Sequence, residues 1–451
     1  MSEQQQPGLT LRLVRGLRGL RYQDIPAPAL ETARQCLLDF LGCALAGADD
    51  PLVDILVAEV AAREGASEAS LIGRSERCTC TTAALINGSA AHALDFDDTH
   101  TTMVGHPSVP VLPAVLALAE VERCSGKQVI EAFVAGFELE CRLGALLGGA
   151  QYAAGFHATG TLGTIGAAAA AARLLDLDEA QWLDAIGLAA TQAAGLKASF
   201  GTMAKPLHAG RAAAVGLQSA LLARRGFSAQ HAILEIAQGF AAAHASPNVS
   251  TEVLDGLEGR FLVRDTLFKY HAACYLTHAA IEAAAELRRT RSLDVAAIGA
   301  VEVRVSPIPL GVCNIPEPVT GLEGKFSLRA AVALALLGED TSALATYSDA
   351  KMREPGLVAV RDCVRVIADP ELPPTQARVV VETPAGRFEA AADTGVPAAD
   401  LAAQRARLAE KFRTLAAPSL GADRAQALCE MVARADELAD IAALLELARA
   451  A

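Results

Sequence analysis

The sequence predicts a mainly α-helical fold: a large all-helical domain built from both ends of the chain, with a smaller α+β domain inserted between them. Apolar residues recur at helical spacing from Pro28 to about Arg260, and the chain is again helical and charged from Asp400. Hydrophobic residues make up 52% of the 451 residues and aromatic residues only 4%. This Ala- and Leu-rich composition favours helices that pack closely through small side chains.

The expected helices of the large domain are mostly separated by Gly, Pro or short polar turns. The first, Ala29–Ala46, has Leu30, Leu37 and Leu41 at roughly helical spacing and ends at Gly47. The others are Val109–Arg123, Lys127–Leu147, Thr161–Leu175, Glu179–Ala190, Pro206–Arg225 and Ala229–Gln238.

The inserted domain is indicated by a change to strand-like alternation. Ala300–Pro307 alternates with period two, and Ala377–Ala392 does so on both sides of a hairpin turn at residues 383–386. Helices are expected between these strands, at Ser327–Leu337 and near Thr346–Arg353.

These patterns set the expected domain boundaries. We expect residues 1–267 and 395–451 to form the helical domain and residues 268–394 to form the α+β domain. A small domain set on a larger one makes a cleft, which is a common place for a ligand.

The composition argues against a membrane protein and against a disulfide framework. The mean hydropathy is positive, but the longest apolar run, Gly160–Ala172, is mostly Gly, Thr and Ala. A membrane span needs about 20 predominantly apolar residues. The N-terminus has polar residues where a signal peptide requires apolar ones. The ten cysteines are scattered, which indicates reduced, buried thiols. We therefore expect a cytoplasmic protein, or one of an organelle matrix, with no membrane partner.

The net charge of −13, with no basic stripe to offset it, argues against a nucleic-acid partner. The same charge means that an anionic ligand would need a local cationic pocket. Four polar clusters interrupt the otherwise apolar helical sequence.

The first cluster contains Asp95, Asp97 and Asp98, followed by His100 and His106. This density of acids and histidines suggests a metal site, while the acids could equally cap the next helix or form a solvated loop. A histidine oriented by a nearby carboxylate is also the usual arrangement for acid–base catalysis. We expect no metal here, because the spacing is not one that identifies a metal site.

The second cluster surrounds His157, within Gly155–Gly163. A dinucleotide-binding loop is disfavoured, since no strand precedes these glycines and no ribose-binding acid follows at the proper distance. Gly160, Gly163 and Gly166 instead predict one smooth helix face for close packing. His157 then lies just before a helix whose free N–H groups attract anions, although a histidine with this pattern alone is more often structural.

The third cluster contains Lys205, Pro206, His208 and Arg211. Proline suits the first position of a helix, so we expect the helix to begin at Pro206, with Lys205 at its mouth. His208 and Arg211 then lie one turn apart on the same side. Three potential cations at a positive helix end form a site for carboxylates; a solvated helix start is the alternative.

The fourth cluster runs from Lys269 to His278, where the helical pattern gives way to the mixed domain. Cys274 and His278 are four residues apart, which would place them on one helix face. A Cys–His nucleophile pair is conceivable, but nothing in the sequence indicates an oxyanion site.

Together these stretches resemble the MmgE/PrpD family in their residues, their order and their spacing. The resembling pieces extend from about residue 30 to residue 390. They are Ala93–Thr99 with His106-Pro107-Ser108, Gly155–Gly163, Lys205–Arg211, Lys269–His278 and Lys325-Phe326-Ser327-Leu328. The resemblance implies a helical domain with a smaller lid domain, a homodimer, and chemistry that needs no iron–sulfur cluster or other cofactor.

The resemblance also implies which residues line the pocket. Those carried over are Asp95, Thr99, His106, His157, Lys205, His208, Lys269 and Cys274. His106 and His157 are the acid–base candidates, with Asp95 orienting one of them. Lys205, His208 and Lys269 would neutralise a carboxylate, while Thr99, Arg211 and Cys274 would help to bind it.

The family includes 2-methylcitrate dehydratase, cis-aconitate decarboxylase and an epimerase that acts on iminodisuccinate. In the decarboxylase branch a histidine falls where this chain has Cys274, and some members have a tyrosine where we read Arg329-Ala330. We therefore expect proton abstraction next to a carboxylate of a small polycarboxylic acid, with dehydration first, epimerisation close behind and decarboxylation as a further alternative. A helical scaffold whose histidines only pack is the non-enzymatic alternative; it would bind no di- or tricarboxylate.

Overall fold

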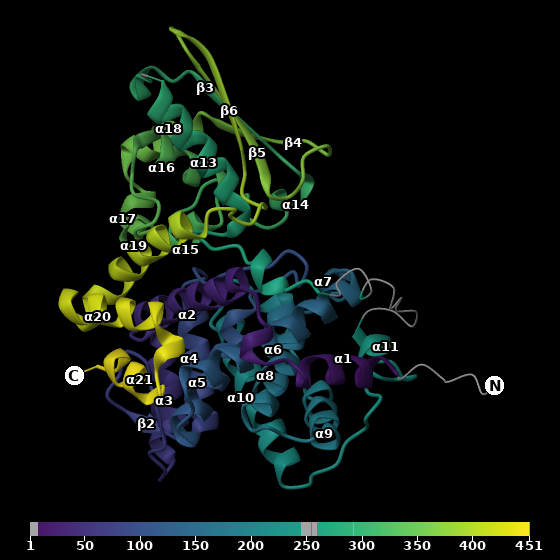
Figure 1. The fold of residues 1–451 in the computed structure, drawn as a ribbon. Helices are drawn as coiled ribbons and strands as arrows, with labels where there is room; N and C mark the ends of the chain where they lie inside the picture. The colour runs from purple at the N-terminus through teal and green to yellow at the C-terminus, as the bar shows by residue number, and fades with distance from the viewer. Residues whose placement is uncertain (1–7, 245–253, 255–258, 292, 451) are drawn as a thin grey trace. The chain divides into compact units, whose positions relative to one another are not determined.

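The computed structural model describes residues 8–244, 254, 259–291 and 293–450. It divides into two compact units, one formed by residues 1–268 and 398–451 and the other by residues 269–397. The fold is mainly helical with small sheets, as the sequence predicted (Figure 1). Within the described residues, none of the helices combines the length and the apolar character that crossing a bilayer requires.

The larger unit is helical apart from a short antiparallel pair, β1 (Ala69–Ser70) and β2 (Arg77–Cys78). Its helices before the second unit are α1 (Leu9–Arg18), α2 (Ala27–Gly47), α3 (Pro51–Glu59), α4 (Cys80–Ala93), α5 (Ser108–Glu122), α6 (Gly126–Leu147), α7 (Ala150–Ala153), α8 (Ala158–Leu174), α9 (Glu179–Ala190), α10 (Ala204–Arg224) and α11 (Phe240–His244). The chain returns to it with α19 (Leu401–Leu420), α20 (Ala422–Ala433) and α21 (Ala442–Ala448).

The core of the larger unit is centred on α8, which packs against α5, α6, α9 and α10 (Figure 1). Every residue of α8 except Arg173 is buried. A side-chain carbon at Gly163 would lie 2.5 Å from Pro110, so only glycine allows α5 this close. The three glycines of α8 therefore serve close packing, as their spacing predicted.

The smaller unit is built on a four-stranded sheet with the order β4-β3-β5-β6. Its strands are β3 (Ala300–Val305), β4 (Val364–Ala368), β5 (Gln376–Thr383) and β6 (Gly386–Asp393). β3 pairs in parallel with β4 and antiparallel with β5, and β5 and β6 form the expected hairpin. Val301 pairs with Val381 and Val303 with Val379, so one face of the sheet is apolar and buried.

Helices cover the sheet of the smaller unit. They are α13 (Tyr275–Thr290), α14 (Pro307–Leu310), α15 (Gly321–Lys325), α16 (Leu328–Leu337), α17 (Asp349–Met352) and α18 (Pro355–Asp362). α13 packs against β5 and β6, and α16 packs against β4. The edge strand β6 alternates charged residues along its exposed side, which discourages pairing with another chain.

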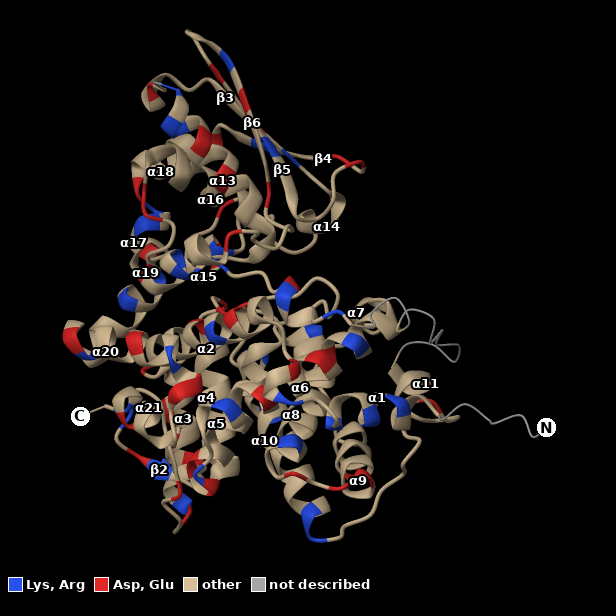
Figure 2. Cartoon of the chain, in the orientation of Figure 1, with Lys and Arg blue, Asp and Glu red and all other residues tan. Residues whose placement is uncertain are grey.

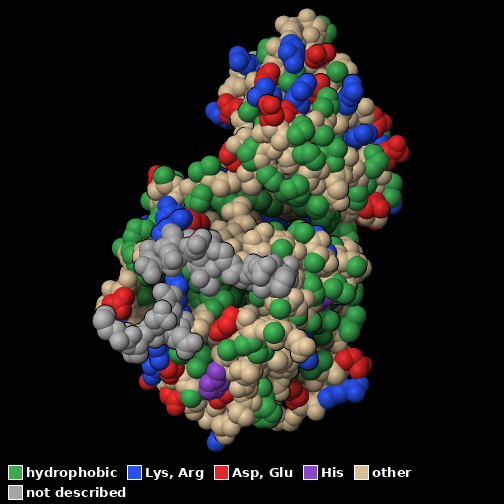
Figure 3. Space-filling view, turned by 90° about the vertical axis from the view of Figure 1, so that its right-hand side faces the viewer, with side chains coloured by type: hydrophobic (Ala, Val, Ile, Leu, Met, Phe, Trp, Pro, Cys, Tyr) green, Lys and Arg blue, Asp and Glu red, His purple; other side chains and the backbone are tan. Residues whose placement is uncertain are grey.

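Charged residues are distributed over both units without separation by sign (Figure 2). On the face drawn in Figure 3, the Lys and Arg side chains lie among Asp and Glu side chains. The described residues of that face therefore present no continuous basic area of the kind that nucleic-acid binding requires.

Two local expectations were wrong. Residues 229–238 form turns and irregular chain instead of a helix, because side chains from elsewhere take the backbone N–H groups. Ala229 N donates to Asp184 (2.9 Å), and Leu234 N donates to Thr10 (3.3 Å). In addition, α10 begins at Ala204 and not at Pro206, which places Lys205 inside the first turn.

Glu140, in the core of the larger unit, is a carboxyl group that is fully removed from water. Glu140 of α6 lies beneath Gly163 and Gly166 of α8, and neither of its oxygens has a hydrogen-bond partner among the described residues. Burial, and then the nearby charge of Asp98, raise the pKa of Glu140 well above its usual value. Burial therefore favours the protonated form of Glu140 in the folded protein.

Replacing Glu140 by Gln should raise thermal stability at alkaline pH. The folded wild type retains a proton that the unfolded chain releases above about pH 4.3, so this group's contribution to stability falls as pH rises towards the folded pKa. Gln has the same size and cannot ionise. Thermal melts from pH 5 to 9 should show a smaller loss of Tm in the variant. Exposed Glu59→Gln is the control, and equal slopes in all three proteins would contradict an elevated pKa for Glu140.

Candidate active site

The candidate site lies in the larger unit, where the loop between α4 and α5 meets the first turns of α8 and α10. The loop reverses through Asp95 and Val104, which both adopt left-handed backbone angles (φ 52° and 56°). Thr99 anchors it by pairing with the backbone of Leu267 at 2.8 and 2.9 Å. Gly105 then approaches Thr159 of α8 so closely that a side-chain carbon would lie 3.1 Å from the Thr159 nitrogen. These contacts fix where the loop's acids and His106 point.

His106 is held at its Nδ1 atom by two acceptors. Nδ1 lies 2.7 Å from the backbone oxygen of Asp98 and 3.1 Å from Asp97 Oδ2. On the other side of the ring, Nε2 lies 3.8 Å from Asp95 Oδ1. The structure thus places Asp97 where an orienting carboxylate acts, and Asp95 beside the opposite nitrogen.

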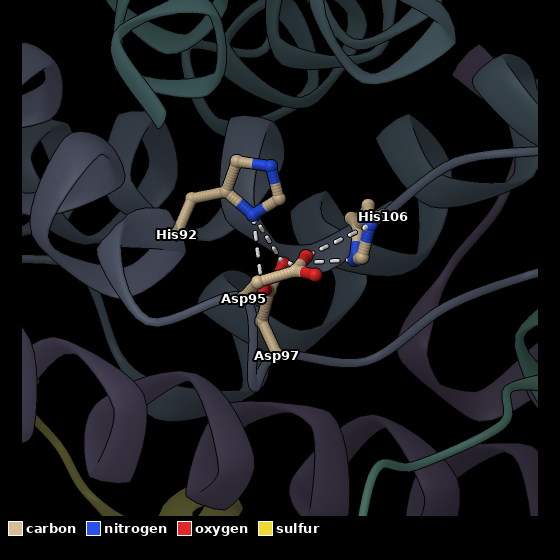
Figure 4. A group of neighbouring side chains, drawn as sticks. All are labelled: His92, Asp95, Asp97 and His106. Carbon is tan, nitrogen blue, oxygen red and sulfur yellow. Dashed lines mark hydrogen bonds and ion pairs between the residues drawn. The ribbon is translucent and has the colours of Figure 1, made fainter. Parts of the chain in front are cut away.

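His92, at the end of α4, completes this group (Figure 4). Its Nδ1 lies 2.9 Å from both carboxylate oxygens of Asp97, and its ring makes an edge contact with His106 at a centroid distance of 4.7 Å. Burial lowers the pKa of His92 to about 4, against the opposing attraction of Asp97. Burial would raise the pKa of Asp97, but the charges and hydrogen bonds of His92 and His106 outweigh it and hold that pKa well below the usual value.

Lys205 pairs with Asp95 across the same loop. Its Nζ lies 2.6 Å from Asp95 Oδ1 and 5.2 Å from the centre of the Phe200 ring. Asp95 Oδ1 therefore stands between an ammonium group and the Nε2 atom of His106. Both side chains of the pair are largely removed from water, which strengthens their interaction.

A second pair of histidines adjoins the first. His157, the N-cap residue of α8, has its Nδ1 3.2 Å from Nδ1 of His208 on α10, so one nitrogen donates and the other accepts. The His157 ring stacks on His92 at 5.8 Å and meets Phe200 edge-on at 5.0 Å. Burial first, and then the surrounding cationic groups, lower the pKa of His157; burial and Lys205 lower the pKa of His208. Both imidazoles are neutral at physiological pH.

The structure brings most of the expected site residues of the larger unit together. Asp95, His106, His157, Lys205 and His208 form one cluster with His92 and Asp97. Thr99 donates its hydroxyl to the Gly105 carbonyl (3.1 Å) and so supports the loop. Arg211 is exposed on α10. Instead of three cations at the helix mouth, there is one ammonium paired with Asp95, beside a neutral His208.

Lys269 and Cys274 belong to the smaller unit, and both are buried. Cys274 precedes α13 as its N-cap residue and so does not lie on the helix face with His278, as its spacing had suggested. Its thiol is hydrogen-bonded to that of Cys313, and His278 Nε2 lies 3.2 Å from the Ala273 carbonyl. The roles assigned to Lys269 and Cys274 stay predictions.

Sequence reasoning missed His92. It occurs in an apolar helical stretch, where a single histidine reads as a core residue. The one available signal is its position five residues before Asp97, which allows the end of a helix to face the loop that follows.

The same four residues could hold a metal ion geometrically. One ligand atom from each of His92, Asp95, Asp97 and His106 lies within 4.8 Å of the others. Imidazole and carboxylate are suitable ligands for divalent transition metals. However, Asp95 is already neutralised by Lys205, and both oxygens of Asp97 contact imidazole N–H groups. The carboxylate oxygens that would bind a metal are thus already engaged by Lys205 and by the imidazole N–H groups.

The purified protein should therefore contain no stoichiometric metal. Elemental analysis should give well below one transition-metal ion per chain, and EDTA or added Zn²⁺ should leave the Tm unchanged. In Lys205→Met, by contrast, Asp95 loses its ammonium partner, so a Tm increase with added Zn²⁺ is expected there. About one tightly held ion in the wild type would contradict this reading of the cluster.

Comparison with known sequences matches most of this chain to one protein family. The family described as MmgE/PrpD N-terminal domain matches residues 12–252, and the MmgE/PrpD C-terminal domain matches residues 271–437. A cis-aconitate decarboxylase of Aspergillus terreus is 29% identical over 98% of this chain and 96% of its own length. The human cis-aconitate decarboxylase is 28% identical over 97% of this chain and 94% of its own. The chain belongs to the MmgE/PrpD family.

Proposed function

We propose that this chain is a lyase that moves a proton at a carbon next to a carboxylate of a small di- or tricarboxylic acid. One observation carries the proposal: Lys205 Nζ and His106 Nε2 both lie close to one carboxylate oxygen, Asp95 Oδ1, at 2.6 and 3.8 Å. A charge-neutralising group and a proton-transfer group are thus within reach of a single small ligand.

The chemistry requires both groups. A carbon acid next to a carboxylate is very weak, because its carbanion adds charge to a group that is already anionic. Lys205 would neutralise that carboxylate as charge builds, exchanging its contact with Asp95 for one with the substrate. His106 Nε2 would take the proton, since Nδ1 is occupied by acceptors. Neutral His157 is the second acid–base candidate.

We propose dehydration, as in 2-methylcitrate dehydratase, as the reaction: after proton removal, hydroxide leaves from the neighbouring carbon and a double bond forms. Decarboxylation is the second candidate, because the relatives above are cis-aconitate decarboxylases. Against it stand Cys274, where that branch has histidine, and Ala330 on α16, which supplies no phenol. Reprotonation on the opposite face would give an epimerase of an amino- or imino-dicarboxylate.

The predictions of a homodimer and of a cytoplasmic location are part of this proposal and rest on the family resemblance and the sequence. Light scattering of the purified protein tests the first, and fractionation of cells tests the second.

Proton NMR in deuterated water distinguishes the three reactions. The substrates are citrate, 2-methylcitrate, cis-aconitate and aspartate derivatives, each with the wild-type protein. We expect a hydroxy acid to give an unsaturated product, with deuterium at the substrate carbon in the reverse reaction. Carbon dioxide release from cis-aconitate would favour decarboxylation, and deuterium incorporation with inversion alone would favour epimerisation. No turnover and no Tm shift with any acid would contradict the proposal.

Replacing Lys205 by Met should lower turnover by at least about 100-fold, the scale expected for losing one stabilising group at a developing charge. Met retains the apolar stem and removes only the charge. Some stability should also be lost, since Asp95 keeps its charge without its partner. Rates are therefore normalised to folded protein. Lys351→Met, which removes a surface lysine of the smaller unit, is the control. Equal rates in both variants would exclude a role for the Lys205 ammonium.

A further inference from the structure

Asp97 is the most deeply enclosed charged group of the candidate site (Figure 4). Its side chain is 1% exposed, compared with 16% for Asp95. Both of its oxygens lie 2.9 Å from His92 Nδ1, and Oδ2 also lies 3.1 Å from His106 Nδ1. One buried carboxylate thus contacts the Nδ1 atom of each of two histidines, His92 and His106.

These contacts determine where the imidazole protons lie. An ionised carboxylate and a backbone carbonyl can only accept hydrogen bonds. His106 Nδ1 faces one of each, Asp97 and the Asp98 carbonyl, so it must carry a hydrogen. His92 Nδ1 faces Asp97 in the same way. When each ring is neutral, its Nε2 atom is therefore the one with a free lone pair.

This arrangement reverses the preference of a neutral histidine in water, which carries its hydrogen mainly on Nε2. A reversed tautomer requires a fixed acceptor at Nδ1, and the hydrogen bond at one nitrogen sets the state of the other. At His106 Nδ1 the acceptors are Asp97 and the Asp98 carbonyl, and at His92 Nδ1 the acceptor is Asp97. Asp95 cannot serve, since it lies beside Nε2 of His106 and is paired with Lys205.

We propose that Asp97 is a positioning residue that fixes His106 in the Nδ1–H form, so that a bare Nε2 faces the substrate, and that His92 holds Asp97 in the orientation this requires. The inference deepens the proposed function in one respect only: it assumes that His106 is the base. The proton placement itself is a property of the resting protein.

His92 contributes through its geometry. By bonding both oxygens of Asp97, it fixes the plane of the carboxylate and leaves Oδ2 directed at His106. Its Nε2 is buried without a hydrogen-bond partner among the described residues. The N–H groups of His92 and His106 together offset the cost of burying the Asp97 carboxylate. Removal of either imidazole should therefore weaken the contact between Asp97 and the other imidazole.

The first test is a ¹⁵N NMR spectrum of wild-type protein labelled at histidine, which distinguishes protonated from bare ring nitrogens. The nine histidines are assigned by single substitutions. We expect His92 and His106 to show hydrogen at Nδ1 and none at Nε2. Hydrogen on Nε2 of neutral His106 would overturn the proposal without any variant.

The second test is Asp97→Asn. An amide offers one acceptor oxygen and one donor nitrogen, so it cannot accept from both imidazoles. At least one ring should switch to the Nε2–H form, and turnover should fall by at least about 100-fold with little change in KM, the scale of one acid–base group. Asp184→Asn is the matched control: Asp184 pairs with surface His231 at 3.0 Å, so only the His231 signal should change.

Two further variants keep the outcomes separable. His92→Asn retains a donor near the position of Nδ1 and should keep His106 in the Nδ1–H form, whereas His92→Leu removes the donor and should reduce the population of that form. An unchanged His106 spectrum in His92→Leu would refute the assigned role of His92. His106→Gln tests the proposed function: full activity would remove His106 as the base while the wild-type spectrum still decides the tautomer. An inactive His106→Gln with Nε2–H in the wild type would reject only the role of Asp97.

Discussion

The site depends on how the negative charges of two largely buried carboxylates, Asp95 and Asp97, are balanced by neighbouring groups. Asp95 is compensated by an ammonium, Lys205, at 2.6 Å, whereas Asp97 is compensated by the N–H groups of two imidazoles, those of His92 and His106. An ionised group is costly to bury unless it is paired and hydrogen-bonded. The difference in compensation separates the two acids: in the proposed function Lys205 exchanges Asp95 for the ligand's carboxylate, whereas Asp97 keeps its imidazole partners.

This balance has a consequence for anion binding. Within the larger unit, the cluster contains one cation and two carboxylates, and the pKa values of His157 and His208 are lowered. A polycarboxylate therefore needs positive charge from Lys205 on leaving Asp95, from a proton taken up by an imidazole, or from the predicted contribution of Lys269. Binding should then be accompanied by proton uptake, because each added carboxylate favours a charged imidazole.

The sequence allowed the fold class and most helices to be predicted, since the spacing of apolar residues records which face of each helix is buried. The hairpin of β5 and β6 followed from period-two alternation around a turn. Residues 229–238 could not be predicted, because Asp184 and Thr10, which capture their backbone, are distant in sequence. The site shows the same limit. The motif Asp95-Phe96-Asp97 and His106 were recognisable in the sequence, but their spacing alone could not predict which of the two acids faces Nδ1 of His106.

The identity of the reaction depends on groups outside this cluster. Proton removal and carboxylate neutralisation are common to dehydration and epimerisation, and decarboxylation also passes through charge next to a carboxylate. Loss of hydroxide needs an acid at the leaving oxygen, whereas loss of carbon dioxide needs an acid only at carbon. The positions at which this chain departs from the decarboxylase pattern, Cys274 and Ala330, both lie in the smaller unit. Cys274 is buried, and its thiol interacts with that of Cys313. In the proposed function the base and the counter-charge come from the helical unit, and the acid at the leaving group is what distinguishes the reactions.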